Sequence, residues 1–201
     1  MADVWLAWLA FAVLAASPGP STMAIMGTSL AYGREAGMRF AAGVVSGSVT
    51  WGVLSALGTA ALLGQAAWTL TGLKIAGGVY FLWLAFKAGR SACQGTPVQD
   101  GTVNPRRAYL AGLALHLTNP KAVFSWTTIV VLGMPAGAPA HHTFFILAGC
   151  AVLAITINMG YAIVFSNRQV VCGYRKVKRW VDGTLAVLFT LAGVRLLTWR
   201  T

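Results

Sequence analysis

Residues 108–134 read AYLAGLALHLTNPKAVFSWTTIVVLGM, and this stretch decides the fold. It is long and apolar enough to cross a bilayer, whose hydrocarbon core of about 30 Å requires roughly 20 apolar residues in a helix. Its middle contains Thr118-Asn119-Pro120-Lys121, and proline interrupts a helix because it lacks an N–H group and clashes with the preceding turn. The sequence therefore predicts a membrane-spanning helix that is broken near its centre.

A second apolar run, residues 4–30, has the same design, with Ser17-Pro18-Gly19-Pro20 in its middle. Each interruption lies about 12 to 14 residues from the start of its run, which at 1.5 Å per residue is near the centre of a bilayer. A single proline can simply kink a helix and shape a bundle. Two matched interruptions in corresponding spans instead favour the binding site of a transporter.

Four further apolar runs have the length of a span, at residues 39–63, 66–88, 142–165 and 181–199. Of the 201 residues, 57% are apolar and only 9% are charged, whereas soluble domains carry about 25% charged residues. The net charge is +11, but the basic residues form short groups between apolar runs, as in multi-span membrane proteins. The composition excludes a soluble enzyme and a nucleic-acid-binding domain, and it predicts an all-α integral membrane protein with six spans.

The basic residues also predict the orientation of these spans. Eleven of the fifteen Lys and Arg residues lie in the loops after the first, third and fifth runs or at the edges of those loops, and the positive-inside rule places these loops in the cytoplasm. Both termini are then extracytoplasmic. Residues 91–107 form a cytoplasmic linker between two three-span halves of one membrane domain, 1–90 and 108–201. Because three is an odd number of spans, related halves must have opposite orientations.

The residues around the two interruptions predict an anion-binding site. Ser17-Pro18 and Asn119-Pro120 each have the form of a helix cap followed by proline at the first helical position. Each interruption is therefore expected to start a second half-helix inside the membrane. Its unpaired N–H groups and positive dipole end attract an anion such as a carboxylate.

Lys121 and His116 are the ionisable residues closest to the second interruption. A Lys at this depth costs at least about 2.5 kcal/mol, and no carboxylate within a span can pair with it. Either it loses its proton, or a ligand carboxylate supplies its counter-charge, or it binds backbone carbonyls that the interruption leaves free. His116 either carries a proton or is a hydrogen-bonded packing residue.

Three groups of residues give the chain a resemblance to a known family. They are Ala16–Pro20 with Gly33–Gly37 and Ala42-Gly43, then Leu73–Lys87, and finally Gly112-Leu113 with Leu117–Ala122. In this order and spacing they resemble the lysine-exporter and homoserine/threonine-exporter (LysE/RhtB) family of amino-acid efflux transporters. The resemblance implies export of amino acids or related small metabolites across the bacterial plasma (inner) membrane, driven by the proton gradient. His116 departs from the family, whose members often carry a polar amide there.

No acidic residue lies in the interior of an expected span, since Asp182 is at the cytoplasmic end of the last run, and this narrows the class of substrate. A cationic substrate would need a carboxylate partner in the cavity, so we expect a neutral amino acid, and no metal or cofactor. The candidate substrate-binding residues are Ser17, Pro18, Gly19, Pro20, Ser21, Asn119, Pro120 and Lys121, and the candidates for proton coupling are His116 and Lys121.

Two other functions remain open from the sequence. The chain could be a membrane scaffold or assembly subunit that transports nothing, in which case the interruptions only aid packing. An intramembrane enzyme would need a nucleophile with a base, or paired acids, within the spans, and the sequence offers neither. Small residues in the second run, such as Gly43, Gly47 and Gly52, permit a homo-oligomer without requiring one.

Overall fold

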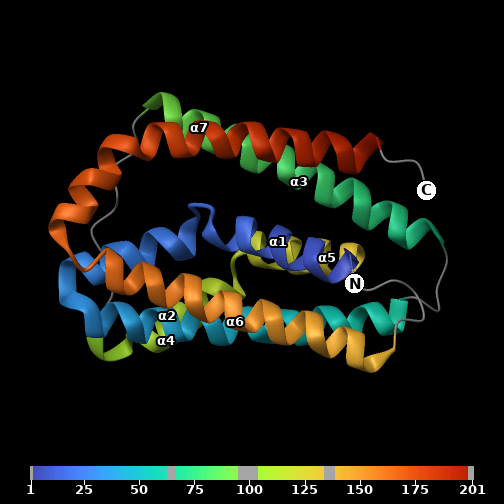
Figure 1. The fold of residues 1–201 in the computed structure, drawn as a ribbon, viewed down its shortest axis with the longest axis horizontal. Coiled ribbons are helices and arrows are strands. Elements are labelled where there is room, and N and C mark those ends of the chain that lie inside the picture. Colours follow the sequence, from blue (N-terminus) through green and yellow to red (C-terminus); the bar gives the residue numbers. More distant parts are fainter. Residues whose placement is uncertain (1, 63–66, 95–103, 134–138, 199–201) are drawn as a thin grey trace. The chain divides into compact units, whose positions relative to one another are not determined.

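The computed structural model describes residues 2–62, 67–94, 104–133 and 139–198. Within these ranges the chain forms seven α-helices and one short 3-10 helix, and it contains no strand (Figure 1). The elements are α1 (Ala2–Ala16), α2 (Pro20–Leu62), α3 (Ala67–Gln94), η1 (Pro105–Arg107), α4 (Ala108–Leu117), α5 (Pro120–Gly133), α6 (Ala140–Val164) and α7 (Arg168–Thr198). The expected all-α class is therefore confirmed.

Both predicted interruptions are present. Helix α1 ends at Ala16 and α2 begins at Pro20, while α4 ends at Leu117 and α5 begins at Pro120. In each case a proline is the first residue of the new helix, a position where its missing N–H group costs nothing. The interruptions divide the runs 4–30 and 108–134 at the places where the sequence contains Ser-Pro-Gly-Pro and Thr-Asn-Pro-Lys.

Two other expected boundaries were wrong. The predicted loop after residue 30 is instead a kink inside α2 at Gly33, whose φ of 83° is unfavourable for residues with a side chain. Figure 1 shows the chain reversing its direction within α2. Helix α7 begins at Arg168 rather than near residue 181, because Arg and Lys are strong helix formers and the basic stretch continues the helix.

Two of the described helices have the length and apolar composition of a membrane span, whereas the sequence predicts six spans. Among the described residues, two helices are long and apolar enough to cross a bilayer, Pro20–Gly58 and Ala140–Val164, and Val4–Ala16 is a shorter apolar helix. The interruptions explain part of this result, since they divide two of the expected spans into short helices. The six-span inverted repeat remains a prediction.

Contacts group the chain into two compact units, one of residues 1–60 and 98–171 and the other of residues 61–97 and 172–201. In the first unit, α1 packs against α5 and α6 around a core that includes Phe11, Trp126 and Ile146. A second core joins α2, α4 and α6 through Phe40, Ala108 and other buried apolar residues. Both interruptions lie in this first unit.

Glycines allow α2 and α4 to approach closely in the first unit. A β-carbon at Gly43 would lie 2.0 Å from the carbonyl oxygen of Tyr109, and one at Gly112 would lie 2.2 Å from that of Phe40. No side chain fits at either distance, so the two backbones are in direct contact. This contact fixes α4, and with it the interruption at its end, against α2.

The second unit consists of α3 and most of α7. Gly78 and Gly193 bring these helices together, since a β-carbon at Gly193 would lie 3.0 Å from the carbonyl oxygen of Gly78. Lys178 and Asp182 form a buried ion pair with an N–O distance of 2.6 Å. Ser91 of α3 donates a hydrogen bond of 2.7 Å to the same carboxylate oxygen, which satisfies a charge that would otherwise be costly to bury.

We expect Gly112→Ala to destabilise the protein, because the new methyl group would collide with the backbone of α2. Overpacking of this kind costs about 1–3 kcal/mol, which thermal unfolding in detergent would detect as a lower melting temperature. Gly160→Ala in α6 is the matched control, since a β-carbon there meets no atom within 4 Å. Equal stability of the two variants would contradict the close contact between α2 and α4.

Candidate functional site

The last carbonyl groups of α1 all need partners, because the helix ends where the chain is interrupted. The Ser17 amide donates to Val13 O at 3.0 Å, and the Ser17 hydroxyl donates to Leu14 O at 2.7 Å. The hydroxyl of Tyr161, from α6, donates to Ala16 O at 2.6 Å. Within the described residues, these contacts give donors to three of the last four carbonyl groups of α1, two from Ser17 and one from α6.

Lys121 completes this set from the other half of the chain. Its Nζ donates to Ser17 O at 2.7 Å and to Ser17 Oγ, and the residue is only 8% exposed. The ammonium therefore lies at the C-terminal end of α1, where the helix dipole favours a cation. Of the alternatives that the sequence left open, the structure shows the contact with a carbonyl freed by the interruption. An ammonium has three N–H donors, and these contacts use two.

Gly19 makes room for the Lys121 side chain. A β-carbon at Gly19 would lie 3.1 Å from both Cδ and Nζ of Lys121. This distance is tighter than ordinary van der Waals contact, so a larger residue would displace the ammonium. Gly19 therefore has a steric role in the first interruption.

At the second interruption, neighbouring residues of the chain supply the hydrogen-bond partners of the backbone groups. The Thr118 hydroxyl and amide both donate to Ala114 O, at 2.9 and 3.0 Å. Asn119 caps α5, since its Oδ1 accepts from the Lys121 amide at 3.0 Å and its carbonyl accepts from the Ala122 amide at 2.9 Å. The expectation that α5 presents unpaired N–H groups is therefore wrong, because Asn119 occupies them.

The start of α2 differs from that of α5. Because α2 begins at Pro20, its cap is Gly19, and the predicted pairing of a Ser17 cap with Pro18 as the first helical residue is wrong. Glycine has no side chain to cap the helix. Within the described part of the chain, the amides of Ser21 and Thr22 donate no hydrogen bond, whereas the Met23 amide donates to Gly19 O at 2.9 Å.

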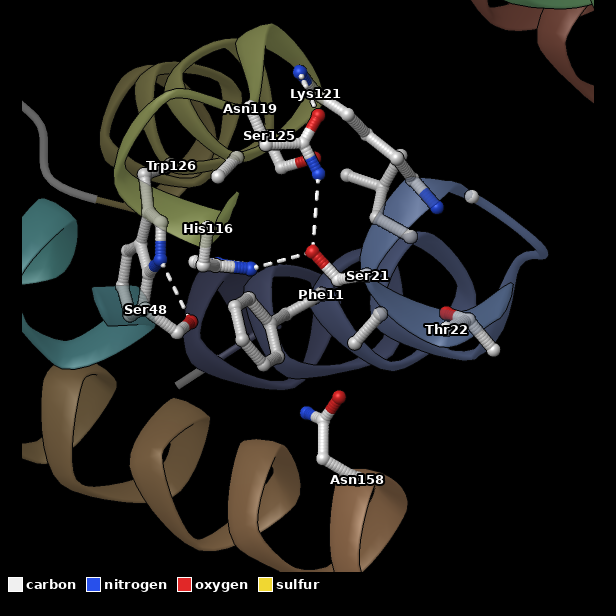
Figure 2. A pocket seen from close by; sticks show the side chains of 14 residues that line it. Phe11, Ser21, Thr22, Ser48, His116, Asn119, Lys121, Ser125, Trp126 and Asn158 are labelled. Atoms are coloured by element: carbon white, nitrogen blue, oxygen red, sulfur yellow. Dashed lines mark hydrogen bonds between the residues drawn. The ribbon is translucent and has the colours of Figure 1, made fainter. Parts of the chain in front are cut away.

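Ser21 connects the two interruptions (Figure 2). Its hydroxyl oxygen accepts a hydrogen bond of 3.2 Å from Asn119 Nδ2. It also lies 3.0 Å from His116 Nδ1, with a donor that depends on the tautomer of the ring. The first turn of α2 is thereby joined to the end of α4 and the start of α5.

A cavity opens where these groups meet. Its apolar lining includes Phe11 and Trp126, whose ring centroids are 5.0 Å apart. Its polar lining is contributed by α2, α4, α5 and α6 and consists of Ser21, Thr22, Ser48, His116, Asn119, Lys121, Ser125 and Asn158. No residue that lines this cavity is acidic, and the described residues contain no group of three or more His, Cys, Asp or Glu suited to a metal.

The cavity contains some of the predicted site residues and not others. Gly19, Ser21, His116, Asn119 and Lys121 line it. The other predicted residues shape the interruptions without lining the cavity, and they are Ser17, Pro18, Pro20 and Pro120.

Sequence reasoning missed several lining residues, among them Thr22, Ser48, Trp126 and Asn158. Asn158 could have been found, because it is an amide within the expected span 142–165. Nothing in the sequence distinguishes Ser48 and Trp126, which become neighbours only in the fold, where Trp126 Nε1 donates to Ser48 Oγ at 3.1 Å.

Comparisons with known proteins find bacterial efflux proteins and membrane proteins similar to this chain along most of its length. The chain is 28% identical over 192 residues to the threonine efflux protein of Escherichia coli K12, covering 92% of each chain. It is 27% identical over 185 residues to the leucine efflux protein of Enterobacter sp. strain 638, covering 89% of this chain and 87% of the relative. An uncharacterized membrane protein of Pseudomonas aeruginosa is 28% identical over 206 residues, which cover 98% of this chain and 95% of the relative. No solved structure matches significantly.

The profile of one protein family, described as the LysE type translocator, matches residues 12–200. This match covers both interruptions, the end of α1 and the helices from α2 to α7. The chain therefore belongs to the LysE type translocator family, and it is a transport protein rather than an enzyme.

Proposed function

We propose that this protein exports neutral amino acids or related small metabolites from the bacterial cytoplasm, and that the cavity between the two interruptions binds the substrate. The observation that carries this proposal is a buried ammonium group, Lys121 Nζ, at a cavity whose lining contains no carboxylate. The similarity to a threonine efflux protein and a leucine efflux protein supports a neutral amino acid as substrate.

The substrate carboxylate binds at the start of α2. The amides of Ser21 and Thr22 have no acceptor within the described residues, and the dipole of α2 favours an anion at its N-terminus. The third N–H donor of Lys121 supplies positive charge beside them. The carboxylate therefore meets two amides and one ammonium, while α5 contributes through Lys121 rather than through its own capped N-terminus.

A neutral amino acid fits this charge distribution better than a cationic one. The side chain of a cationic amino acid would add a further positive charge beside the α-ammonium and Lys121, with no carboxylate in the lining to neutralise it, and an unpaired buried charge is strongly destabilising.

The two halves of the chain form an inverted repeat of six spans, in which transport proceeds by alternating access. The grouping of contacts supports this proposal. The first unit combines the first two expected spans of each half, and the second unit combines the third span of each half. Corresponding parts of the two halves therefore associate with one another, as a pseudo-two-fold relation requires.

Export is coupled to the proton gradient, and His116 is the candidate that carries the proton. Its ring nitrogen contacts Ser21, the residue whose amide we assign to the substrate carboxylate. Protonation of this ring would therefore act directly on the first turn of α2. Lys121 remains the second candidate, because it is buried and ionisable.

We expect Lys121→Met to abolish export, because the substrate carboxylate loses its only cationic partner in the cavity. The measurement is efflux of preloaded radiolabelled threonine or leucine from cells, with membrane insertion confirmed by fractionation. Lys176→Met removes an exposed Lys from α7 and serves as the matched control. Export at the wild-type rate by Lys121→Met would remove the assigned role, and no efflux from the wild type would favour a scaffold.

Carboxylate recognition can also be tested without a variant. We expect the amides of threonine and leucine, which lack the carboxylate, to compete at least about 10-fold less well than the parent amino acids. This estimate follows from losing hydrogen bonds to a charged group, each worth about 1.5–3 kcal/mol. Competition assays in proteoliposomes measure the difference, and equal competition would contradict the site.

The predicted orientation has its own measurement. A reporter fused after Thr201 should be active outside the cytoplasm, because six spans with cytoplasmic basic loops place both termini there. A reporter placed between Arg168 and Arg179 should be cytoplasmic. Cytoplasmic signals from both fusions would show that the chain between them does not cross the bilayer, so that the number of spans is not six.

A further inference from the structure

Asn158 is a buried amide that the substrate site described above does not use. It belongs to α6, is 6% exposed and lines the cavity. Figure 2 shows it on the α6 side of the cavity, apart from the group formed by Ser21, Asn119 and His116. Burial of an amide in an apolar helix is costly unless its polar atoms are used.

One hydrogen bond fixes the orientation of this amide. Asn158 Nδ2 donates to Ala154 O at 2.8 Å. Because a backbone carbonyl can only accept, the NH₂ group must face Ala154, and Oδ1 must be the other atom of the amide. The side chain therefore offers the cavity its acceptor, while one of the two N–H donors of its NH₂ group is held by Ala154 O.

Three other side-chain oxygens at the cavity already accept hydrogen bonds. Asn119 Oδ1 accepts from the Lys121 amide, Ser21 Oγ accepts from Asn119, and Ser48 Oγ accepts from Trp126. Within the described residues, Asn158 Oδ1 receives no hydrogen bond. It is the carbonyl acceptor left for a ligand in a lining otherwise rich in donors.

We propose that Asn158 Oδ1 accepts a hydrogen bond from the α-ammonium group of the substrate, so that the protein selects amino acids over carboxylic acids without an amine. This inference rests on the proposed function, in which the carboxylate binds across the cavity at the start of α2. A carbonyl suits this task because it attracts an ammonium without a full negative charge. A carboxylate at the same place would instead compete for Lys121.

The discrimination follows from the cost of an unpaired acceptor. An acid without the amine would displace water from Asn158 Oδ1 and give it no donor in return. Sites that hydrogen-bond a substrate group reject analogues that lack it, because the buried polar group is left unpaired. We expect the wild-type protein to prefer the amino acid by about 10-fold or more.

The test is a competition assay in proteoliposomes that contain the full chain. The probes are radiolabelled L-leucine and L-threonine, and the competitors are the same amino acids and their deamino counterparts, 4-methylpentanoate and 3-hydroxybutanoate. Each deamino acid keeps the carboxylate and side chain and replaces the ammonium with hydrogen. The ratio of inhibition constants within each pair measures recognition of the ammonium.

Asn158→Leu removes the acceptor and nearly conserves volume. We expect it to reduce the preference to within about 2-fold, because the amino acid loses its acceptor and the deamino acid no longer leaves a buried acceptor unpaired. Thr156→Val is the matched control on the same helix. It removes a hydroxyl that also donates to the carbonyl four residues earlier, at 2.9 Å, but which is exposed and outside the cavity. It should retain the wild-type preference.

Each outcome supports or overturns the inference. A wild-type protein that does not distinguish the two acids overturns it without any variant, as does Asn158→Leu with an unchanged preference. If Asn158→Leu does not insert, Asn158→Ala replaces it with the same expected loss. If the wild type transports neither amino acid, the proposed function fails and this inference fails with it. Transport without discrimination overturns only the role of Asn158.

Discussion

The first half of this fold depends on satisfying the backbone at the end of α1. An unpaired carbonyl in an apolar environment costs several kcal/mol, and the interruption after Ala16 exposes a full turn of them. Ser17, Tyr161 and Lys121 supply the donors. Because Tyr161 and Lys121 belong to α6 and to the start of α5, α1 cannot end where it does unless the second half of the chain is folded against it.

The two interruptions have similar sequences but differ in how their backbone groups are hydrogen-bonded. The second is closed by its own residues, since Thr118 satisfies the end of α4 and Asn119 caps α5. At the first interruption, the carbonyl groups at the end of α1 accept hydrogen bonds from other helices as well, and the amides of Ser21 and Thr22 have no acceptor within the described residues. The difference comes from one position, because the residue before the helical proline is Asn119 in one case and Gly19 in the other. In the proposed function, this single open N-terminus gives the cavity one anion-binding side rather than two.

The sequence predicted the features that depend on local chemistry. Helices α2 and α5 begin at Pro20 and Pro120. Proline has this effect in any tertiary context, because it has no N–H group to donate to the preceding turn. The assignment of Ser17 as a cap failed, because two prolines lie close together and the sequence does not say which one begins the helix. Asn158 and Trp126 reach the cavity only through packing of α5 and α6 against α1, which is a long-range property that periodicity does not contain.

Lys121 has a consequence for transport that follows from its two kinds of partner. It holds Ser17 across the boundary between the two halves, and in the proposed mechanism it also binds the substrate carboxylate. A carboxylate attracts an ammonium more strongly than a carbonyl does, since both groups are charged. Substrate binding therefore weakens the contact that Lys121 makes with the end of α1. A ligand shifts a conformational equilibrium only if its contacts differ between the two states. The exchange of Ser17 for the substrate carboxylate as the partner of Lys121 provides this difference, at the place where the proposed alternating access separates the two halves.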